Sequence, residues 1–386
     1  MHVGMATGFA NHSQVNDRQF VNEELDQLTL AEELGFDSVW ITEHHFSDYS
    51  VSPNPLFYLA NLAGRTKRIR LGTQVLVVPW HDPVRLAEEI ALLDNLSGGR
   101  AIIGFGRGLA RMEYEGLRVD QTKARALFDE IVPMVMNALE TGFIEGGEHF
   151  KQPRREIRPR PLRGLKGRAF VASGTPESMA SAARLGLGKL FLGQPMTRQT
   201  KSDQPFSNPA TKAAGQAPAQ ETERDVWLET WNESHPGETP PAPFVSNLVF
   251  IDESPDRAME LAKVHAEKTF RAAVKNYEMM SNHHGSLKGY ESYASLVMSP
   301  EQVEEAARNA AAGSVVGDAK TVLAKLDEIR QLRQPQGMFP HLYTGGMSHA
   351  DAVGSMRYFA KTCLNEMKSW KGAPSTIDGP MAMAAE

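Results

Sequence analysis

Short apolar runs alternate along this chain with longer stretches whose apolar residues recur at helical spacing. The run at residues 1–6 is followed by an amphipathic stretch that Gly35 is placed to end, and a new apolar run begins at Asp37. Repetition of this order predicts parallel strands, because parallel neighbours need a helical crossover between them. The strands expected from the pattern are residues 1–6, 37–42, 69–78, 101–104, 169–172, 189–192, 244–251 and 338–343.

The repeats continue far along the chain, which favours closure into a (β/α)8 TIM barrel over an open sheet. An open doubly wound sheet more often carries a phosphate loop after its first strand, and no Gly-x-Gly-x-x-Gly follows Ala6. We expect a single domain at residues 1–371. Within it we expect a polar insertion at about 197–222 and a mobile loop at about 281–295, followed by a disordered tail at 372–386.

The composition excludes several classes of protein. The 386 residues include 41 basic and 47 acidic side chains, and the net charge of −6 argues against nucleic acid as a partner. Cys363 is the single cysteine, which excludes disulfide frameworks and Cys-rich metal or iron–sulfur sites. No apolar run is long enough to span a membrane, and the first residues lack a signal-peptide core. We therefore expect a cytoplasmic protein with no membrane partner.

Polar residues follow directly after several predicted strands, where the loops of a barrel build its active site. Glu43, His44 and His45 come after the second strand, and neutral imidazole suits acid–base chemistry near neutral pH. A structural role, with a strand-end histidine bound by backbone, stays open as the alternative. A metal site is not expected, since later strands lack matching histidine and aspartate ligands. Trp80 and His81 are candidates for a substrate pocket, although Trp80 could equally be a packing residue.

Two further strand ends carry features of a phosphate site. Gly106 and Arg107 combine close backbone approach with a guanidinium that can grip an anion. Ser173, Gly174 and Thr175 precede a proline that opens a helix, so that a hydroxyl, free amides and the positive end of a helix dipole converge. An ordinary turn and an ordinary helix cap are the alternatives. Together the two features favour a phosphorylated cofactor.

Longer segments around these residues carry a resemblance. Residues 34–46 read Leu-Gly-Phe-Asp-Ser-Val-Trp-Ile-Thr-Glu-His-His-Phe, and residues 71–85 read Leu-Gly-Thr-Gln-Val-Leu-Val-Val-Pro-Trp-His-Asp-Pro-Val-Arg. With Asp-Asn-Leu-Ser-Gly-Gly-Arg at 94–100 and Gly-Phe-Gly-Arg-Gly-Leu at 104–109, they resemble the bacterial luciferase-like monooxygenase family. The similarity covers most of the chain, apart from the polar insertion and the tail.

The resemblance implies a TIM-barrel flavoprotein that uses FMN and dioxygen. It implies reduced FMN from a separate NAD(P)H:flavin reductase, and a flavin 4a-(hydro)peroxide that oxygenates a small apolar or carbonyl organic substrate. A homodimer is also implied. His44 matches the catalytic histidine, His45 its supporting neighbour, and Glu43 lies with Trp80 and His81 beside the substrate. The residues that the resemblance assigns to the cofactor are Gln74, Val75, Gly106, Arg107, Arg125, Ser173, Gly174, Thr175 and Ser178.

Some positions depart from the family or need a particular backbone. Gly106 stands where light-emitting luciferases have a reactive cysteine, so bioluminescence is not expected. The Gln74–Val75 bond falls where the family often has a non-prolyl cis peptide. The segment from Ser173 to Ser178 aligns only with a one-residue gap. A deazaflavin-dependent oxidoreductase of the same superfamily and a non-catalytic flavin-binding protein are the alternative functions, and a metal-dependent hydrolase is a further one.

Overall fold

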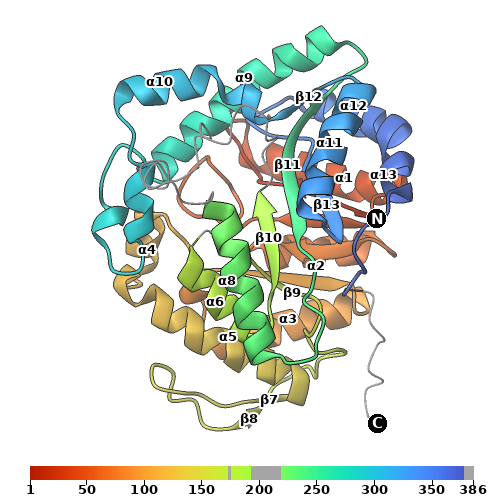
Figure 1. Cartoon of the computed structure of the whole chain (residues 1–386). Helices are drawn as coiled ribbons and strands as arrows, with labels where there is room; N and C mark the ends of the chain where they lie inside the picture. The colour runs from red at the N-terminus through yellow and green to blue at the C-terminus, as the bar shows by residue number, and fades with distance from the viewer. Residues whose placement is uncertain (173–174, 193–218, 378–386) are drawn as a thin grey trace.

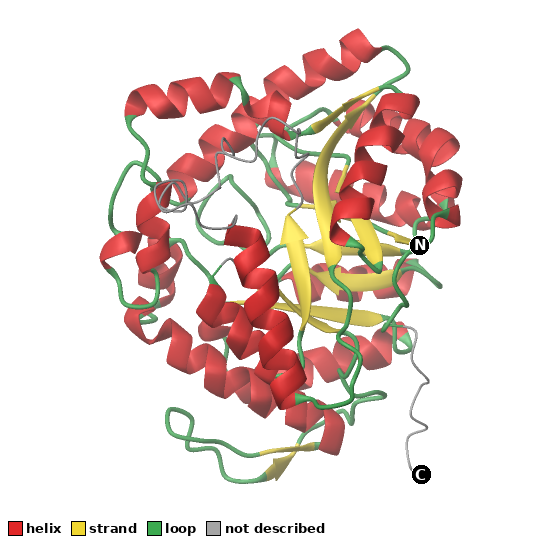
Figure 2. Cartoon of the chain, viewed as in Figure 1, coloured by secondary structure: helices red, strands yellow, loops and turns green. Residues whose placement is uncertain are grey.

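A computed structural model describes residues 1–172, 175–192 and 219–377 of this chain. A parallel sheet forms its centre and closes on itself at the first strand. β1 (His2–Val3) pairs with β13 (Gly337–His341), and β2 (Met5–Thr7) pairs with β3 (Ser38–Ile41). The sheet continues around through β4 (Arg70–Thr73), β6 (Ala101–Gly106), β9 (Ala169–Ala172), β10 (Gly188–Leu192) and β11 (Phe244–Ile251). The predicted (β/α)8 barrel is therefore confirmed, with helices packed around the strands in Figure 2.

Gly4 divides the first strand between its two neighbours. Its amide donates to the Met338 carbonyl oxygen at 2.8 Å, so the chain pairs with β13 before it passes to β3. A Cβ atom at Gly4 would lie 2.2 Å from the Ser38 hydroxyl oxygen, which leaves no room for a side chain. Closure of the barrel thus depends on a glycine at this position. Two short strands extend others, β5 (Leu76–Val77) beyond β4 and β12 (Val315–Gly317) beside the end of β11.

The helices begin and end where the sequence supplies caps. The Asn16 side chain accepts from backbone amides at the start of α1 (Asp17–Leu34), and Gly35 ends that helix at a φ of 93°. Asp82 caps α3 (Pro83–Ser97) in the same way. The other helices in the described residues, placed in Figure 1, are α2 (Pro55–Arg65), α4 (Arg111–Leu117), α5 (Ala124–Thr141), α6 (Pro176–Arg184), α8 (Ala219–Ser234), α9 (Pro255–Asn276), α10 (Pro300–Arg308), α11 (Ala319–Arg333), α12 (His349–Phe359), a π-helical turn (Ala360–Leu364) and α13 (Asn365–Ser369).

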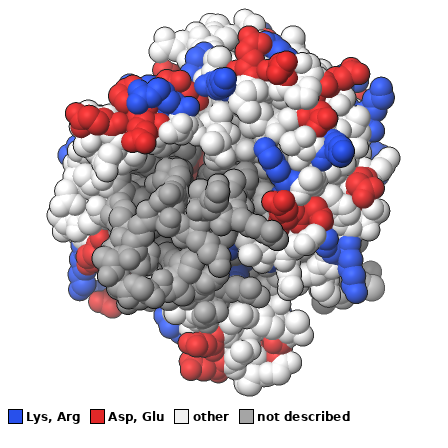
Figure 3. Space-filling model, turned by 45° about the horizontal axis from the view of Figure 1, so that its top comes forward, with Lys and Arg blue, Asp and Glu red and all other residues white. Residues whose placement is uncertain are grey.

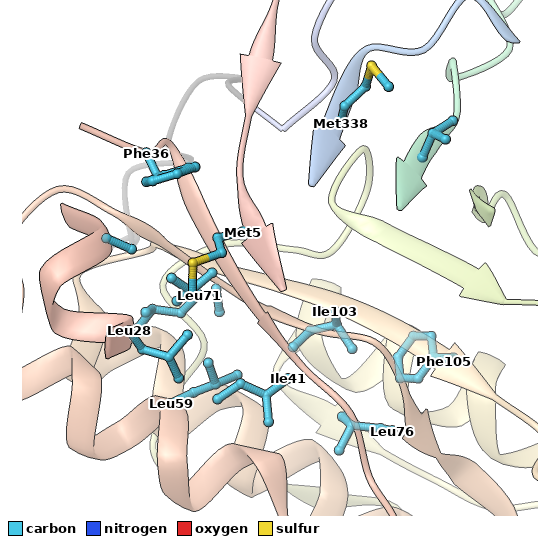
Figure 4. Packing of buried hydrophobic residues seen from close by; sticks show 14 of the residues in the cluster. Met5, Leu28, Phe36, Ile41, Leu59, Leu71, Leu76, Ile103, Phe105 and Met338 are labelled. Carbon is cyan, nitrogen blue, oxygen red and sulfur yellow. The ribbon is translucent and has the colours of Figure 1, made fainter. Parts of the chain in front are cut away.

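Apolar side chains fill two layers of the barrel. In the outer layer, Met5 of β2 lies near Leu28 of α1 and Leu59 of α2, as Figure 4 shows. The inner layer lies inside the strands and is aromatic, with Trp40 stacked on Phe339 at 4.6 Å between ring centroids. Both layers are closely filled, so they hold the strands in place and leave function to the rim. On the face in Figure 3, acidic and basic side chains are interspersed rather than gathered by sign.

The expectation of a disordered tail from residue 372 is wrong for its first residues. The Ala373 amide donates to the Pro335 carbonyl at 3.2 Å, and the Thr376 hydroxyl donates to the Gly167 carbonyl at 2.7 Å. Ile377 is fully buried in the aromatic layer inside the barrel. Pro335 and Gly167 precede strands β13 and β9, so this segment seals the end of the barrel where the strands begin. Residues 378–386 lie outside the described residues.

Other differences from the sequence expectations concern the segments between strands. Residues 219–222, which we expected to end the polar insertion, belong to α8. The rest of the insertion lies outside the described residues. The predicted strand at 69–78 is divided into β4 and β5. A hairpin of β7 (Phe143–Ile144) and β8 (Arg155–Glu156) was not predicted, and it projects below the barrel in Figure 1.

Candidate active site

The residues expected to carry chemistry follow the carboxyl ends of neighbouring parallel strands. β3 pairs with β4, and β6 pairs with both β4 and β5, so the segments after β3, β5 and β6 share one rim. His44, Trp80 and Arg107 stand in these three segments. Ser173 and Gly174, which follow β9, lie outside the described residues.

A buried carboxylate fixes the orientation of His44. Its Nδ1 lies 3.0 Å from Oε1 of Glu113, a residue of α4 whose side chain is 1% exposed. The same oxygen accepts the His45 backbone amide at 2.8 Å. A carboxylate accepts hydrogen bonds, so Nδ1 of His44 donates to Glu113 and Nε2 is the ring nitrogen that faces away from it. The arrangement leaves an oriented imidazole with its basic nitrogen directed away from Glu113.

Two tyrosines surround the other side of the His44 ring. The Tyr277 hydroxyl lies 3.4 Å from Nε2, and the Tyr49 ring packs edge-on at 4.8 Å between centroids. Burial, reinforced by the neighbouring Tyr49 and by the charge of Glu113, raises the pKa of Tyr277 well above its usual range. Tyr277 therefore stays protonated and can donate to Nε2 or to a group that approaches it.

Glu43 joins the strand ends rather than standing free. Its Oε1 lies 2.8 Å from Nε2 of His81 and 3.4 Å from Nε2 of His45, and its Oε2 accepts the Val77 amide at 2.6 Å. Burial favours the neutral acid, but the charge and hydrogen bonds of His81, with those of His45 and Val77, hold the pKa of Glu43 below its usual value. Burial is likewise outweighed at His81, where Glu43 raises the pKa. A substrate contact for Glu43 or His81 stays a prediction.

Trp80 packs within a cluster of rings. Its ring lies edge-on to Tyr114 at 5.6 Å and to His45 at 5.3 Å between centroids. Its Nε1 is buried and has no hydrogen-bond partner in the part of the chain that the structure describes. Trp80 therefore has a packing role, and a polar atom that a ligand could satisfy.

Two guanidinium groups and a helix start form a cationic corner. Arg125 donates to the Ser178 hydroxyl, and the Thr175 side chain caps α6 by accepting the Ser178 amide at 3.2 Å. Burial and the nearby charge of Arg107 lower the pKa of Arg125. Two like charges held close together beside a helix N-terminus are stabilised by an anion. This corner brings together four of the residues expected at the cofactor phosphate.

Arg107 also makes contacts across the rim. Its Nη1 donates to the Gly289 carbonyl at 2.7 Å, and its guanidinium lies 4.0 Å above the centre of the Tyr290 ring. Both partners belong to the segment expected to be a mobile loop, which packs here in turns at 284–286 and 291–296. The sequence around His283 and His284 is typical of a solvated pair, but His284 is buried, with Nε2 3.0 Å from the Tyr277 carbonyl oxygen, so that interpretation is wrong for this residue.

The Gln74–Val75 segment lies beside Gly106 at the rim, where β5 pairs with β6. The Gln74–Val75 peptide bond is cis, as expected from the resemblance. A Cβ atom at Gly106 would lie 2.2 Å from Cγ2 of Val75, which explains why glycine stands at the position of the luciferase cysteine. The Gln74 Oε1 is buried without a hydrogen-bond partner among the described residues. An unpaired acceptor beside glycine backbone and a cationic corner fit the ring system and phosphate of a flavin mononucleotide.

Glu113, Tyr49 and Tyr277 are site residues that the sequence analysis missed. Glu113 stands in a short helix after the glycine-rich segment, and nothing in the sequence links it to a histidine 69 residues earlier. Tyr277 follows α9, the helix after β11.

The described residues contain no group of three or more His, Cys, Asp or Glu side chains arranged to hold a metal ion. No helix of the described residues is long and apolar enough to cross a membrane.

A sequence profile described as luciferase-like monooxygenase matches residues 1–334. The chain belongs to this family. Within the family, it is 32% identical over 175 residues to the oxygenase component of the flavin-dependent trigonelline monooxygenase of Acinetobacter baylyi, which is 45% of this chain and 49% of that protein. It is 30% identical over 187 residues to the alkanal monooxygenase alpha chain of Photorhabdus laumondii, 48% of this chain and 52% of that one. The alignments span about half the length of these curated relatives.

Several solved structures share the fold over nearly the whole chain. The monooxygenase RslO1 from Streptomyces bottropensis is 24% identical with a TM-score of 0.71, covering 95% of this chain and all of that one. The oxygenating constituent of 3,6-diketocamphane monooxygenase from Pseudomonas putida, solved with FMN, is 18% identical with a TM-score of 0.68, covering 94% and 97%. A coenzyme F420-dependent tetrahydromethanopterin reductase from Methanopyrus kandleri is also 18% identical, with a TM-score of 0.61 and the same coverage.

Proposed function

We propose that this protein is a monooxygenase that uses reduced FMN and dioxygen to oxygenate a small, uncharged organic substrate. The observation that carries the proposal is the shared rim of the barrel. There the His44 imidazole, held at Nδ1 by Glu113 and facing Tyr277 at Nε2, is found with a cationic corner suited to a phosphate. The family and the names of the relatives support the same reaction class.

The residues of the corner account for cofactor binding. Arg107 and Arg125 would neutralise the phosphate, while the Ser178 hydroxyl and the start of α6 would supply hydrogen-bond donors. The side-chain Oε1 of Gln74 would accept a hydrogen bond from the flavin ring system. Reduced FMN, when bound, supplies the electrons with which dioxygen is activated. The FMN complex of a fold neighbour supports FMN, and the F420-dependent neighbour keeps deazaflavin as the alternative to be tested.

His44 is the residue best placed to move a proton. Its Nε2 can accept a proton from the reacting group, and Glu113 would stabilise the imidazolium that results. Tyr277 can donate a hydrogen bond at the same place. Because Glu113 and Tyr277 contact His44 from separate segments of the chain, the imidazole is oriented before any ligand arrives.

A separate NAD(P)H:flavin reductase and a homodimer complete the proposal. The word "component" in the name of the trigonelline enzyme supports the reductase. For the dimer, large apolar side chains are exposed on α2 and α3, which pack against each other: Phe57 is 74% exposed, Leu92 48% and Leu96 55%. Exposed apolar surface on neighbouring helices is typical of an interface.

The reaction is tested by mixing the protein and anaerobically reduced FMN with oxygenated buffer while absorbance is recorded. A transient absorbance that free reduced FMN does not give is the expected result. Reoxidation at the rate of free FMN would contradict the proposal. Parallel titrations with FMN and F420 separate the cofactors, because tight binding of F420 with no binding of FMN supports the deazaflavin reaction instead.

Arg125→Ala tests the cationic corner directly. We expect it to weaken FMN binding by about 1.5–3 kcal/mol, the range for hydrogen bonds to a charged group, and to leave riboflavin binding unchanged because riboflavin has no phosphate. Fluorescence titration of both ligands measures the two affinities. Arg65→Ala, which removes a surface guanidinium paired with Asp26, serves as the control. An equal loss of riboflavin affinity in Arg125→Ala would place the arginine elsewhere.

A further inference from the structure

A ring of small and polar side chains lies one step above the aromatic layer inside the barrel. Side chains on a strand point alternately inward and outward. Phe244 on β11 and Phe339 on β13 point inward, in the aromatic layer, so the residues two positions later point inward as well. These are Ser246 and His341. By the same rule Gly104 and Ala172 follow Ile102 and Phe170, and Ala172 is exposed, so the filled interior ends at this level.

Two polar atoms of this ring are buried and unpaired. The Ser246 hydroxyl oxygen and Nε2 of His341 have no hydrogen-bond partner among the described residues. The Ser246 side chain is fully buried and His341 is 8% exposed. Nearly all buried polar atoms in folded proteins are hydrogen-bonded, to protein, water or a ligand. The two atoms therefore mark a place where a water molecule or a ligand group supplies the hydrogen bonds that the described residues do not.

The strands hold these two residues close to each other. β11 and β13 are parallel neighbours, with Ser246 opposite Phe339 and Leu248 opposite His341. Ser246 and His341 are thus one strand apart and two residues out of register, or about 8 Å between Cα atoms from standard strand spacings. With both side chains directed inward, one ligand oxygen can reach the hydroxyl and the imidazole together.

The surroundings favour an uncharged group. The inward-facing residues at this level that the structure describes include Gln74, Gly104 and Ala172, and none of these is an acid, a lysine or an arginine. Burial lowers the pKa of His341 to about 4, so its ring is neutral at neutral pH. A carboxylate or an ammonium would be stripped of water here without a countercharge, which is costly. A carbonyl or hydroxyl oxygen would gain hydrogen bonds without that loss.

We propose that Ser246 and His341 anchor a carbonyl or hydroxyl oxygen of the substrate at the floor of the site. The pair determines which substrates bind, while proton transfer is carried out by His44. His44 follows β3, which the first strand (β1 and β2) separates from β13. This assignment rests on the proposed monooxygenase function, because it takes the barrel mouth as the substrate site.

Binding of small probes to the FMN-loaded protein tests the pair without turnover. The probes are cyclohexanone, cyclohexanol, cyclohexanecarboxylate and cyclohexylammonium, whose rings are the same and whose polar groups differ. Protein labelled with ¹⁵N-histidine reports ligand contact directly through the ring nitrogens of His341. The variants are Ser246→Ala, His341→Leu and the conservative His341→Gln. Ser355→Ala is the control, since it removes a buried hydroxyl of α12 that donates to the Ile251 carbonyl outside the barrel.

We expect the ketone and the alcohol to bind and to shift the His341 nitrogens, and the two charged probes to bind more weakly. Ser246→Ala and His341→Leu should each weaken ketone binding roughly 3- to 10-fold, His341→Gln should recover part of it, and FMN affinity should not change. Four results would overturn the assignment. They are a preference for a charged probe, ketone affinity equal to wild type in Ser246→Ala and His341→Leu, loss of FMN affinity in these two variants, and no binding of any probe. Failure of the wild type to bind FMN would instead contradict the proposed function, and the probes can then still be measured on the protein alone.

Discussion

Glu43 and Glu113 are both buried carboxylates that bind histidines at the rim of the barrel, yet they bind different ring nitrogens. Glu113 binds Nδ1 of His44 and leaves Nε2 to face Tyr277. Glu43 binds His81 and His45 through their Nε2 atoms and also takes the Val77 amide. Both glutamates form a carboxylate–histidine pair, so the pair itself does not identify a catalytic histidine. What differs is the ring nitrogen that the carboxylate does not bind: Nε2 of His44 faces Tyr277 and can exchange a proton, whereas Glu43 binds Nε2 of His81 and of His45 and holds loops together.

His44→Ala should give the largest effect if this comparison is right. Removing a positioned acid–base group costs roughly 10²- to 10⁴-fold in turnover, and FMN affinity should stay as in the wild type because His44 is not part of the cationic corner. Stopped-flow oxygenation and FMN titration measure the two quantities. Full turnover in this variant would remove His44 from the chemistry.

Glu43→Gln should reduce stability instead. Replacing the carboxylate weakens its hydrogen bonds to His81, His45 and the Val77 amide, and a hydrogen bond to a charged group contributes about 1.5–3 kcal/mol to stability. Urea unfolding followed by circular dichroism gives the free energy of unfolding. Once folded at low temperature, the variant should retain substantial turnover. A fully stable variant without turnover would reverse the roles of the two glutamates.

Glu113→Gln keeps the shape of the side chain and removes its charge. We expect the turnover number to fall by about 10- to 100-fold, the worth of a hydrogen bond to a charged group, with little change in the KM for reduced FMN. Glu113→Asp, which keeps the charge, should recover part of the loss. A purely structural role would lower stability and leave turnover per folded molecule unchanged.

The smallest effect concerns pH. Because the pKa of His81 is raised above 6.5 in the folded state, its contribution to stability is complete below 6.5 and is lost as the pH rises through the folded value. The free energy of unfolding should therefore decline above pH 6.5 with a slope of at most about 1.4 kcal/mol per pH unit from this residue. His81→Gln should remove that part of the slope. An unchanged pH profile would show that His81 is not paired in solution.

The fold was largely predictable because its signals are local. Each strand around the barrel coincides with an apolar run in the sequence, and caps such as Asn16 and Gly35 mark helix ends within a few residues. α8 shows what was overlooked, since Trp227 and Trp231 stand four residues apart and bury one face of an otherwise polar helix. The same spacing rule that predicts the other helices would have predicted this one, and its first residues would then have been assigned to a helix rather than to the insertion.

The site was predictable only in part. His44 and Arg107 follow strands and so can be placed at a rim from sequence. Glu113 and Tyr277 reach His44 from other elements, and contacts between residues far apart in the chain leave no periodicity to detect. The burial of Ile377 depends on where the bottom of the barrel lies, which residues 372–377 alone do not reveal.

The way the barrel closes also determines when it can fold during synthesis on the ribosome. Residues 2–3 pair with residues 337–338, and the segment that ends at Ile377 seals the floor, so neither contact can form until nearly the whole chain has been made. At about 5–20 residues per second, the first strand waits roughly 20 to 70 seconds for its last partner. During that interval β1 presents open backbone hydrogen-bonding groups, which can pair with another nascent chain. The barrel can therefore close only when synthesis is nearly finished, whatever the stability of the finished protein.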